Sequence, residues 1–212
     1  MKTKILPFLA VLFFGAISSN AQITQGRYLL GGSASYYNSS TDNNNSGYLN
    51  LQFGKVVKLN TVVGITGSLS ASKNHYGNNG YKLYQYNAGI FYRKYKPLVE
   101  KLNFFAEMDA VFQHGSNYGT YFFNVGQNLY TNLNGIQLSF IPGLSYAVTK
   151  NLQLELTMPN LATISYASIK TVDSKLPAGV SPQKGNNFSA NVNLNANLVN
   201  NFGIGFKFLL GK

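Results

Sequence analysis

The sequence predicts an all-β protein, folded as a closed, antiparallel, up-and-down transmembrane β-barrel of about eight strands. Charged residues make up only 11% of the chain, against about 25% in a typical soluble domain. Tyr (15), Phe (15) and Gly (21) are abundant and Trp is absent, which is the composition of many strands and turns. From Gly26 onward, apolar and small polar residues alternate with a period of two, as in strands with two unlike faces.

The N-terminus predicts export. Lys2 and Lys4 give a short basic start, and an apolar run follows from Ile5 to Ile17. Ser19-Asn20-Ala21 then places small residues at the two positions that a signal peptidase reads. A membrane anchor is the alternative reading, but the run is shorter than the about 20 residues that a spanning helix needs. We therefore expect a signal peptide with its cut before Gln22.

Removal of a signal peptide over residues 1–21 would leave residues 22–212 as one outer-membrane barrel domain. The chain carries a formal net charge of +11. A basic chain can bind nucleic acid, but an exported one rarely meets it, and no nucleic-acid motif is present. Anionic lipid headgroups and lipopolysaccharide phosphates are the expected counter-charges. The sequence has no Cys, so hydrogen bonds and burial must hold the fold without disulfides.

The alternation divides into eight runs joined by connections of unequal length. The runs lie at residues 28–36, 49–53, 63–71, 84–92, 104–112, 136–146, 152–158 and 188–208. Short connections lie at residues 58–60, 95–102 and 149–151, and long polar ones near residues 38–46, 74–80, 114–134 and 168–187. Short periplasmic turns opposite long outer loops are typical of a membrane barrel. The eighth run is about twice the 9–11 residues of a spanning strand, so we expect it either to project beyond the outer leaflet or to bend near Asn200-Asn201.

Alternation alone also fits a soluble, lipocalin-like barrel, whose apolar face would line a ligand cavity. The second face decides between them, because it consists of Asn, Ser, Gln, Thr and Gly with few charges. A water-facing surface would carry many more Lys and Glu. Small polar residues suit the lumen of a narrow barrel, and the apolar face would then contact lipid, with Tyr and Phe near both edges. Only a helix or a closed barrel satisfies all backbone groups in lipid.

Three segments carry a resemblance to a known family. Ile90–Leu98 followed by Leu102–Glu107 looks like the fourth-to-fifth-strand hairpin of the small outer-membrane β-barrel domain family. Pro142–Tyr146 followed by Thr149–Leu152 resembles its sixth-to-seventh hairpin. Gly203–Phe208 is similar to the C-terminal signal read by the barrel-assembly machinery, with Gly203, Phe206 and Phe208 as its residues. That signal usually ends the chain, whereas Leu209–Lys212 follow here. The resemblance implies a roughly eight-stranded barrel in the outer membrane of a Gram-negative bacterium, of porin-like type, and no particular activity.

Charged residues of the lumen-facing parity form the first candidate site. They number three of each sign and lie in the half nearer the short turns: Arg27, Arg93, Glu107, Asp109, Glu155 and Lys207. Buried charges need partners, so we expect one or more salt-bridge clusters there. Such a cluster could form a gate or an ion path. An eight-stranded barrel is only just wide enough for its own side chains, which favours a plug that fixes the register.

His114-Gly115-Ser116-Asn117 forms the second candidate site. It is similar to the His-x-Ser-Asn of lipid A deacylases, in which His114 would act as base and Ser116 as nucleophile. The motif lies at the end of the fifth run, whereas in that family it lies on the penultimate strand. No acidic residue stands on a neighbouring run to orient the imidazole. We therefore expect these residues to form the start of a loop and not a catalytic site. No set of His and Cys has zinc-site spacing, so we expect no metal and no cofactor.

The sequence therefore favours a non-enzymatic protein of the outer membrane, reached by secretion across the inner membrane and insertion by the barrel-assembly machinery. Its role would be structural, adhesive or in surface interaction, carried by long outer loops. Its partners would be outer-membrane lipid and lipopolysaccharide, with no nucleic acid, and it would be monomeric. A lipid A-modifying hydrolase using His114 and Ser116, a narrow pore and a soluble ligand binder stay open as alternatives. The sequence names no ligand.

Overall fold

The computed structural model describes residues 23–39, 44–76, 79–121, 127–158, 161–173, 182–193 and 203–211. The expected signal peptide lies outside these ranges. The described residues form ten strands: β1 (Tyr28–Ser39), β2 (Asn44–Lys58), β3 (Thr61–Tyr76), β4 (Asn79–Val99), β5 (Leu102–Tyr121), β6 (Gln127–Ala147), β7 (Leu152–Thr157), β8 (Ala162–Asp173), β9 (Gln183–Val192) and β10 (Gly203–Leu210). No helix in this part of the chain is long and apolar enough to cross a membrane.

Eight of the strands close into a ring, and every pairing is antiparallel. The order around the ring is β1-β2-β3-β4-β5-β6-β7-β10, and β10 returns to β1. Closure runs from Tyr28↔Leu210 to Gly32↔Phe206 between β1 and β10. The predicted all-β fold, a closed, antiparallel, eight-stranded barrel, is confirmed.

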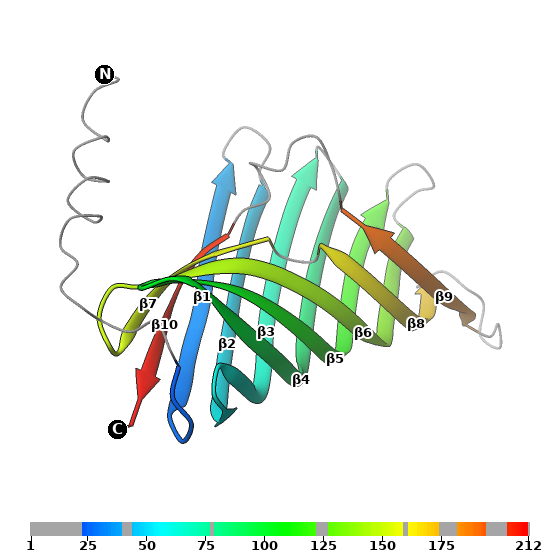
Figure 1. Cartoon of the computed structure of the whole chain (residues 1–212). Coiled ribbons are helices and arrows are strands. Elements are labelled where there is room, and N and C mark those ends of the chain that lie inside the picture. Colours follow the sequence, from blue (N-terminus) through cyan, green and yellow to red (C-terminus); the bar gives the residue numbers. More distant parts are fainter. Residues whose placement is uncertain are drawn as a thin grey trace.

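The remaining strands, β8 and β9, form a hairpin that continues the seventh and eighth predicted runs. Strand β6 serves both parts, because Gly143–Ala147 pairs with β7 and Leu129–Phe140 pairs with β8. The eighth predicted run is thus divided between β9 and β10, whereas the seventh corresponds to β7 alone. Pro159, which has no N–H for a ladder, follows β7 in the sequence. In Figure 1 the β8–β9 hairpin stands at the opposite side of the sheet from β1. The predicted bend at Asn200-Asn201 lies outside the described residues.

The connections opposite the short turns are shorter than predicted. The strands stop and restart at residues 39 and 44, 76 and 79, and 121 and 127. Most of the polar stretches that we expected to be long loops are therefore strand, so this prediction is wrong. These polar stretches continue the strands and pair with each other across the ladder, so that each backbone N–H and C=O group finds a hydrogen-bond partner. The period-two test missed them because both of their faces are polar or aromatic.

The short turns lie close to their predicted positions. Leu59-Asn60 joins β2 to β3, and Asn60 has φ 59°, a left-handed conformation that Asn adopts more readily than most residues. The predicted turn at residues 95–102 is too long, because β4 continues to Val99 and only Glu100-Lys101 turns. Tyr95 is consequently a strand residue, and its side chain is buried inside the barrel.

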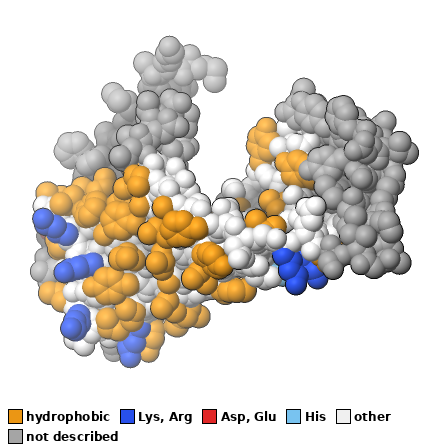
Figure 2. Space-filling model, turned by 90° about the vertical axis from the view of Figure 1, so that its right-hand side faces the viewer, with side chains coloured by type: hydrophobic (Ala, Val, Ile, Leu, Met, Phe, Trp, Pro, Cys, Tyr) orange, Lys and Arg blue, Asp and Glu red, His pale blue; other side chains and the backbone are white. Residues whose placement is uncertain are grey.

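The apolar side of the alternation faces outward. Ile65, Ile90 and Ile136 are 62%, 64% and 62% exposed, whereas the lumen-facing Leu29 and Phe105 are fully buried. Figure 2 shows hydrophobic side chains gathered across the outer wall, with Lys and Arg side chains at its margin. A lipocalin-like binder would need these side chains inside, so that alternative is wrong.

A small apolar core closes the lumen at the short-turn end. Its members are Ile23, Leu29, Val56, Val62, Phe91, Tyr95, Phe105 and Leu209. Glycines make room for the rings, since a Cβ on Gly143 would lie 2.5 Å from Cζ of Phe105. Ile23 is held over this end by two hydrogen bonds: its N–H donates to Oδ1 of Asn60, and the Asn60 N–H donates to its carbonyl, each at 3.0 Å. We call this group the floor of the barrel.

Candidate functional site

The centre of the lumen is a charge cluster built around Arg93. Arg93 and Glu107 are directly paired across β4 and β5, and Nε of Arg93 lies 2.5 Å from Oε2 of Glu107. Glu155 reaches the same guanidinium from β7, with Oε1 2.6 Å from Nη1. All three side chains are almost completely buried, with at most 2% exposed. The cluster therefore ties three strands of the ring together through one cation.

The floor supports this cluster from below. The guanidinium carbon of Arg93 lies 4.3 Å from the centre of the Phe105 ring, a cation–π contact that strengthens when desolvated. Nη1 of Arg93 donates to the Tyr95 hydroxyl at 3.0 Å, and that hydroxyl lies 3.4 Å from Oε1 of Glu155. The aromatic core thus fixes the plane of the guanidinium as well as sealing the lumen.

Lys207 of β10 joins the cluster through Gln52 of β2. Nζ of Lys207 donates to Oε1 of Gln52, whose Nε2 donates to Oε1 of Glu107 at 2.9 Å. Gly31 makes this reach feasible, because a Cβ there would lie 2.0 Å from Cδ of Lys207. The network spans β2, β4, β5, β7 and β10, and it therefore fixes the register across the β1–β10 closure.

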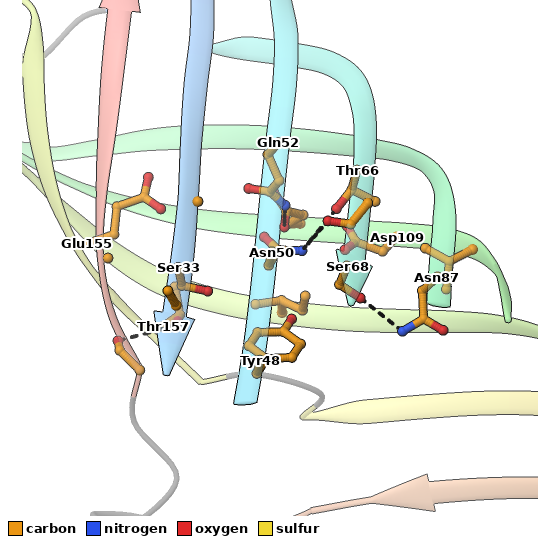
Figure 3. Close-up of a pocket in the computed structure, with 18 of the residues that line it drawn as sticks. Ser33, Tyr48, Asn50, Gln52, Thr66, Ser68, Asn87, Asp109, Glu155 and Thr157 are labelled. Atoms are coloured by element: carbon orange, nitrogen blue, oxygen red, sulfur yellow. Dashed lines mark hydrogen bonds between the residues drawn. The ribbon is translucent and has the colours of Figure 1, made fainter. Parts of the chain in front are cut away.

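Above the cluster the lumen widens into a polar cavity of about 590 Å³. Its walls carry amides and hydroxyls, with hydrogen bonds from Asn50 to Thr66 (3.3 Å) and from Asn87 to Ser68 (2.9 Å) (Figure 3). Asp109, Glu155, Arg93 and Lys207 also line it. The lumen is thus a cup, closed by the floor and lined by uncharged polar groups over a charged base.

Four of the six predicted lumen charges meet in one network, namely Arg93, Glu107, Glu155 and Lys207. Asp109 lines the same cavity without an ion pair at salt-bridge distance among the described residues. Arg27 departs from the prediction, because it lies before β1 at the short-turn end. Its guanidinium donates to the carbonyls of Lys150 and Leu209 and to Oδ1 of Asn151, so it fastens the β6–β7 turn to β10 outside the lumen.

The residues that sequence reasoning missed are Gln52 and Tyr95. Gln52 has the lumen-facing parity but carries no charge, so the pattern of charged residues does not distinguish it from the other polar residues of the lumen. The sequence predicts Tyr95 at the start of a turn that contains Pro97. In the structure Pro97 pairs with Asn103, beside an irregularity in the β4–β5 ladder. The sequence signal for Tyr95 was its spacing, since Phe91, Arg93 and Tyr95 share one face.

His114 and Ser116 lie on β5 with the outward parity. Nδ1 of His114 lies 2.7 Å from Oδ1 of Asn134, and its ring stacks on Tyr86 with 6.4 Å between centroids. The partner of the imidazole is an amide, whereas a hydrolase would need a carboxylate there to orient the ring. The two residues are in a strand, not at the start of a loop as we predicted.

Two further groups complete the sequence candidates. Gly203, Phe206 and Phe208 lie in β10, with both Phe rings about half exposed on the outer wall; their role as an assembly signal stays a prediction. Among the described residues, no three His, Cys, Asp or Glu side chains are grouped so that they could hold a metal ion.

Comparison with known proteins gives a fold likeness and no family. No protein-family model matches the sequence, and no curated protein matches it. A solved structure of a major outer membrane protein from Thermus thermophilus is similar, with 11% sequence identity and a TM-score of 0.46. The match covers 87% of this chain and 99% of that one. The sequence identity and the TM-score are both too low to transfer a function.

Proposed function

We propose that the protein is an integral barrel of the bacterial outer membrane, without enzymatic activity, whose far end interacts with other surfaces. The observation that carries this proposal is the continuous apolar outer wall. Soluble monomers rarely expose apolar patches beyond a few hundred Å², yet large apolar side chains stand outward on every strand of the ring. Contact with lipid would remove the free-energy cost of exposing these apolar side chains to water.

The height of the apolar wall fits a bilayer. On β4 the outward apolar residues run from Tyr84 to Tyr92, and on β5 from Phe104 to Phe112. About nine residues at 3.3 Å each give about 30 Å of strand. A tilt of about 40° brings this to about 23 Å, close to the apolar band of about 25 Å in outer-membrane barrels. Aromatic rings stand at both limits, as an interfacial girdle would.

The strand ends beyond this band support a role in surface contact. They carry exposed tyrosines among Asn, Ser and Gly: Tyr36, Tyr37, Tyr81 and Tyr130 are 75%, 56%, 40% and 51% exposed. Tyrosine supplies a large contact area at low entropic cost and Ser, Gly and Asn supply adaptable hydrogen bonds, which is the chemistry of antibody paratopes. Projecting strands hold this surface more rigidly than the loops that we expected from the sequence.

The proposal also covers how the protein reaches the membrane and which molecules surround it there. Secretion across the inner membrane and insertion by the barrel-assembly machinery would deliver a monomer into outer-membrane lipid and lipopolysaccharide. Hydrolysis of lipid A by His114 and Ser116 lacks support, because the imidazole is partnered by an amide. A pore also lacks support, since the floor and the Arg93 cluster occupy the lumen.

The test combines cell fractionation with gel mobility before and after boiling. We expect the protein in the outer-membrane fraction, running at a shifted position unheated and losing that shift on boiling. A protein found in the periplasm or medium without a heat shift would refute the membrane location. Ser116→Ala, scored by the acylation pattern of lipid A, is expected to change nothing.

A further inference from the structure

We infer that the lumenal cup is a binding site for a donor-rich, hydroxylated ligand that carries an amine, namely an amino sugar or a short chain of them. The inference rests on the barrel and its cavity, and it does not depend on the membrane location proposed above. A barrel of eight strands can hold one small ligand, and a cavity of about 590 Å³ lies within the usual range of ligand pockets, roughly 300–1,000 Å³.

Two acceptor atoms in the described part of the cup are left without a hydrogen-bond partner. Oε2 of Glu155 and Oδ1 of Asp109 are buried and have no hydrogen-bond partner among the described residues. Glu155 is 1% exposed and lines the cavity (Figure 3). A buried carboxylate oxygen without a partner costs free energy that a donor from a ligand would recover.

Both cations at the base already donate hydrogen bonds within the network. Arg93 directs its guanidinium to Glu107, Glu155, Tyr95 and Gln52. Lys207 donates to Gln52. Three carboxyl groups thus lie beside two cations, with Asp109 within hydrogen-bond reach of Glu107. An ammonium group would find acceptors there, whereas a phosphate would bring further acceptor oxygens against them.

The wall supplies what a sugar ring needs. Amide side chains can donate and accept at once, and Asn50, Gln85, Asn87, Gln113 and Gln137 all line the cavity. Tyr48 lines it as well, and an aromatic ring offers a flat apolar face beside a polar edge. Hydroxyls along one ring edge would meet the amides while the apolar face of the sugar packs on Tyr48.

The experiment is calorimetric titration of the full barrel, refolded in detergent, with the glucosamine disaccharide. The N-acetylated disaccharide and glucose 6-phosphate are the comparison probes. We expect saturable binding of the amine form and at least tenfold weaker binding of both others. Asp109→Asn, which keeps the shape of the side chain, should weaken the binding at least tenfold. Glu100→Gln, on the exposed β4–β5 turn, is the matched control and should change nothing.

Tyr48→Leu provides a second variant at the wall, away from the charge cluster, and should also weaken binding. Heat-dependent gel mobility verifies that each variant is folded before titration. Tighter binding of glucose 6-phosphate would overturn the inference, because the cup would then be governed by Lys207 and Arg93. Equal affinities in the parent, Asp109→Asn and Tyr48→Leu would place the binding elsewhere, and no binding of any probe at 10 mM would also overturn it.

Discussion

At the scale of single residues, Arg93 is the side chain on which the interior depends most. It neutralises Glu107 and Glu155, both of which are essentially fully buried. Arg93→Met would keep the volume but remove the cation that forms ion pairs with both carboxylates. Breaking a buried pair in this way costs about 3–5 kcal/mol. We expect the urea midpoint of unfolding, followed by gel mobility in detergent, to fall accordingly.

Lys94→Met is the control for this prediction, because Lys94 is the next residue on β4 and its side chain is exposed. It should leave the midpoint unchanged. Arg93→Met combined with Glu107→Gln and Glu155→Gln should recover part of the loss, since the two carboxylates that lost their ion-pair partner are then neutral amides. Equal midpoints for Arg93→Met and Lys94→Met would show that the cluster contributes nothing to stability.

Gly31 provides a second prediction at this scale. A Cβ at this position would lie 2.0 Å from Cδ of Lys207, so Gly31→Ala must push the lysine away from Gln52. Cδ, Cε and Nζ belong to the flexible end of the lysine, which borders the cavity. We therefore expect a cost near the lower end of the about 1–3 kcal/mol that overpacking brings. At Gly47 the nearest atom to a new Cβ is 4.0 Å away, and Gly47→Ala is therefore expected to be neutral. The free energies of unfolding of the two variants, measured side by side, decide the matter.

At the scale of the strand, period-two alternation predicted the barrel because one face is apolar and the other small and polar. It succeeded along the stretch from Tyr84 to Tyr92, where apolar side chains on the outer face alternate with polar side chains in the lumen. It failed beyond His114, where both faces of β5 are polar or aromatic and only the neighbouring ladder holds the chain extended. The alternation also predicted that Arg93 and Glu107 face the lumen. It could not predict the role of Gln52, because that role depends on hydrogen-bond partners that lie on other strands of the ring.

If the outer wall faces lipid, the free-energy cost of placing a charge on it should depend on depth in the membrane. Ile90 stands in the middle of the apolar band and is 64% exposed, while Tyr36 stands beyond its outer limit and is 75% exposed. In lipid, Ile90→Arg should cost about 2–4 kcal/mol and Tyr36→Arg about 0–1 kcal/mol. Reversible unfolding in vesicles gives both values. If the wall faced water, both substitutions would be neutral or stabilising, and the two variants would not differ.

At the scale of the whole molecule, the barrel is a cup and not a channel. The base is sealed twice, by the apolar floor that Phe91 and Phe105 fill and by the Arg93 cluster above it. Neither seal was evident in the sequence alone, because the floor joins residues from the N-terminal segment, several strands of the ring and the C-terminal strand. Only the closure between β1 and β10 brings Leu29 and Leu209 against the rings of β4 and β5.

The sealed base predicts that the protein does not conduct ions. In planar bilayers we expect no stable current steps from the parent protein, because the floor leaves no continuous water path along the lumen. Removal of both rings in Phe91→Ala/Phe105→Ala should open a path beside Arg93 and produce discrete steps, provided that gel mobility shows a folded barrel. Leu51→Ala/Phe53→Ala, on the outer wall of β2, changes similar volume outside the lumen and should stay silent. Steady conductance from the parent protein would mean that the floor moves aside in the membrane, and the pore would then replace the cup as the description of this barrel.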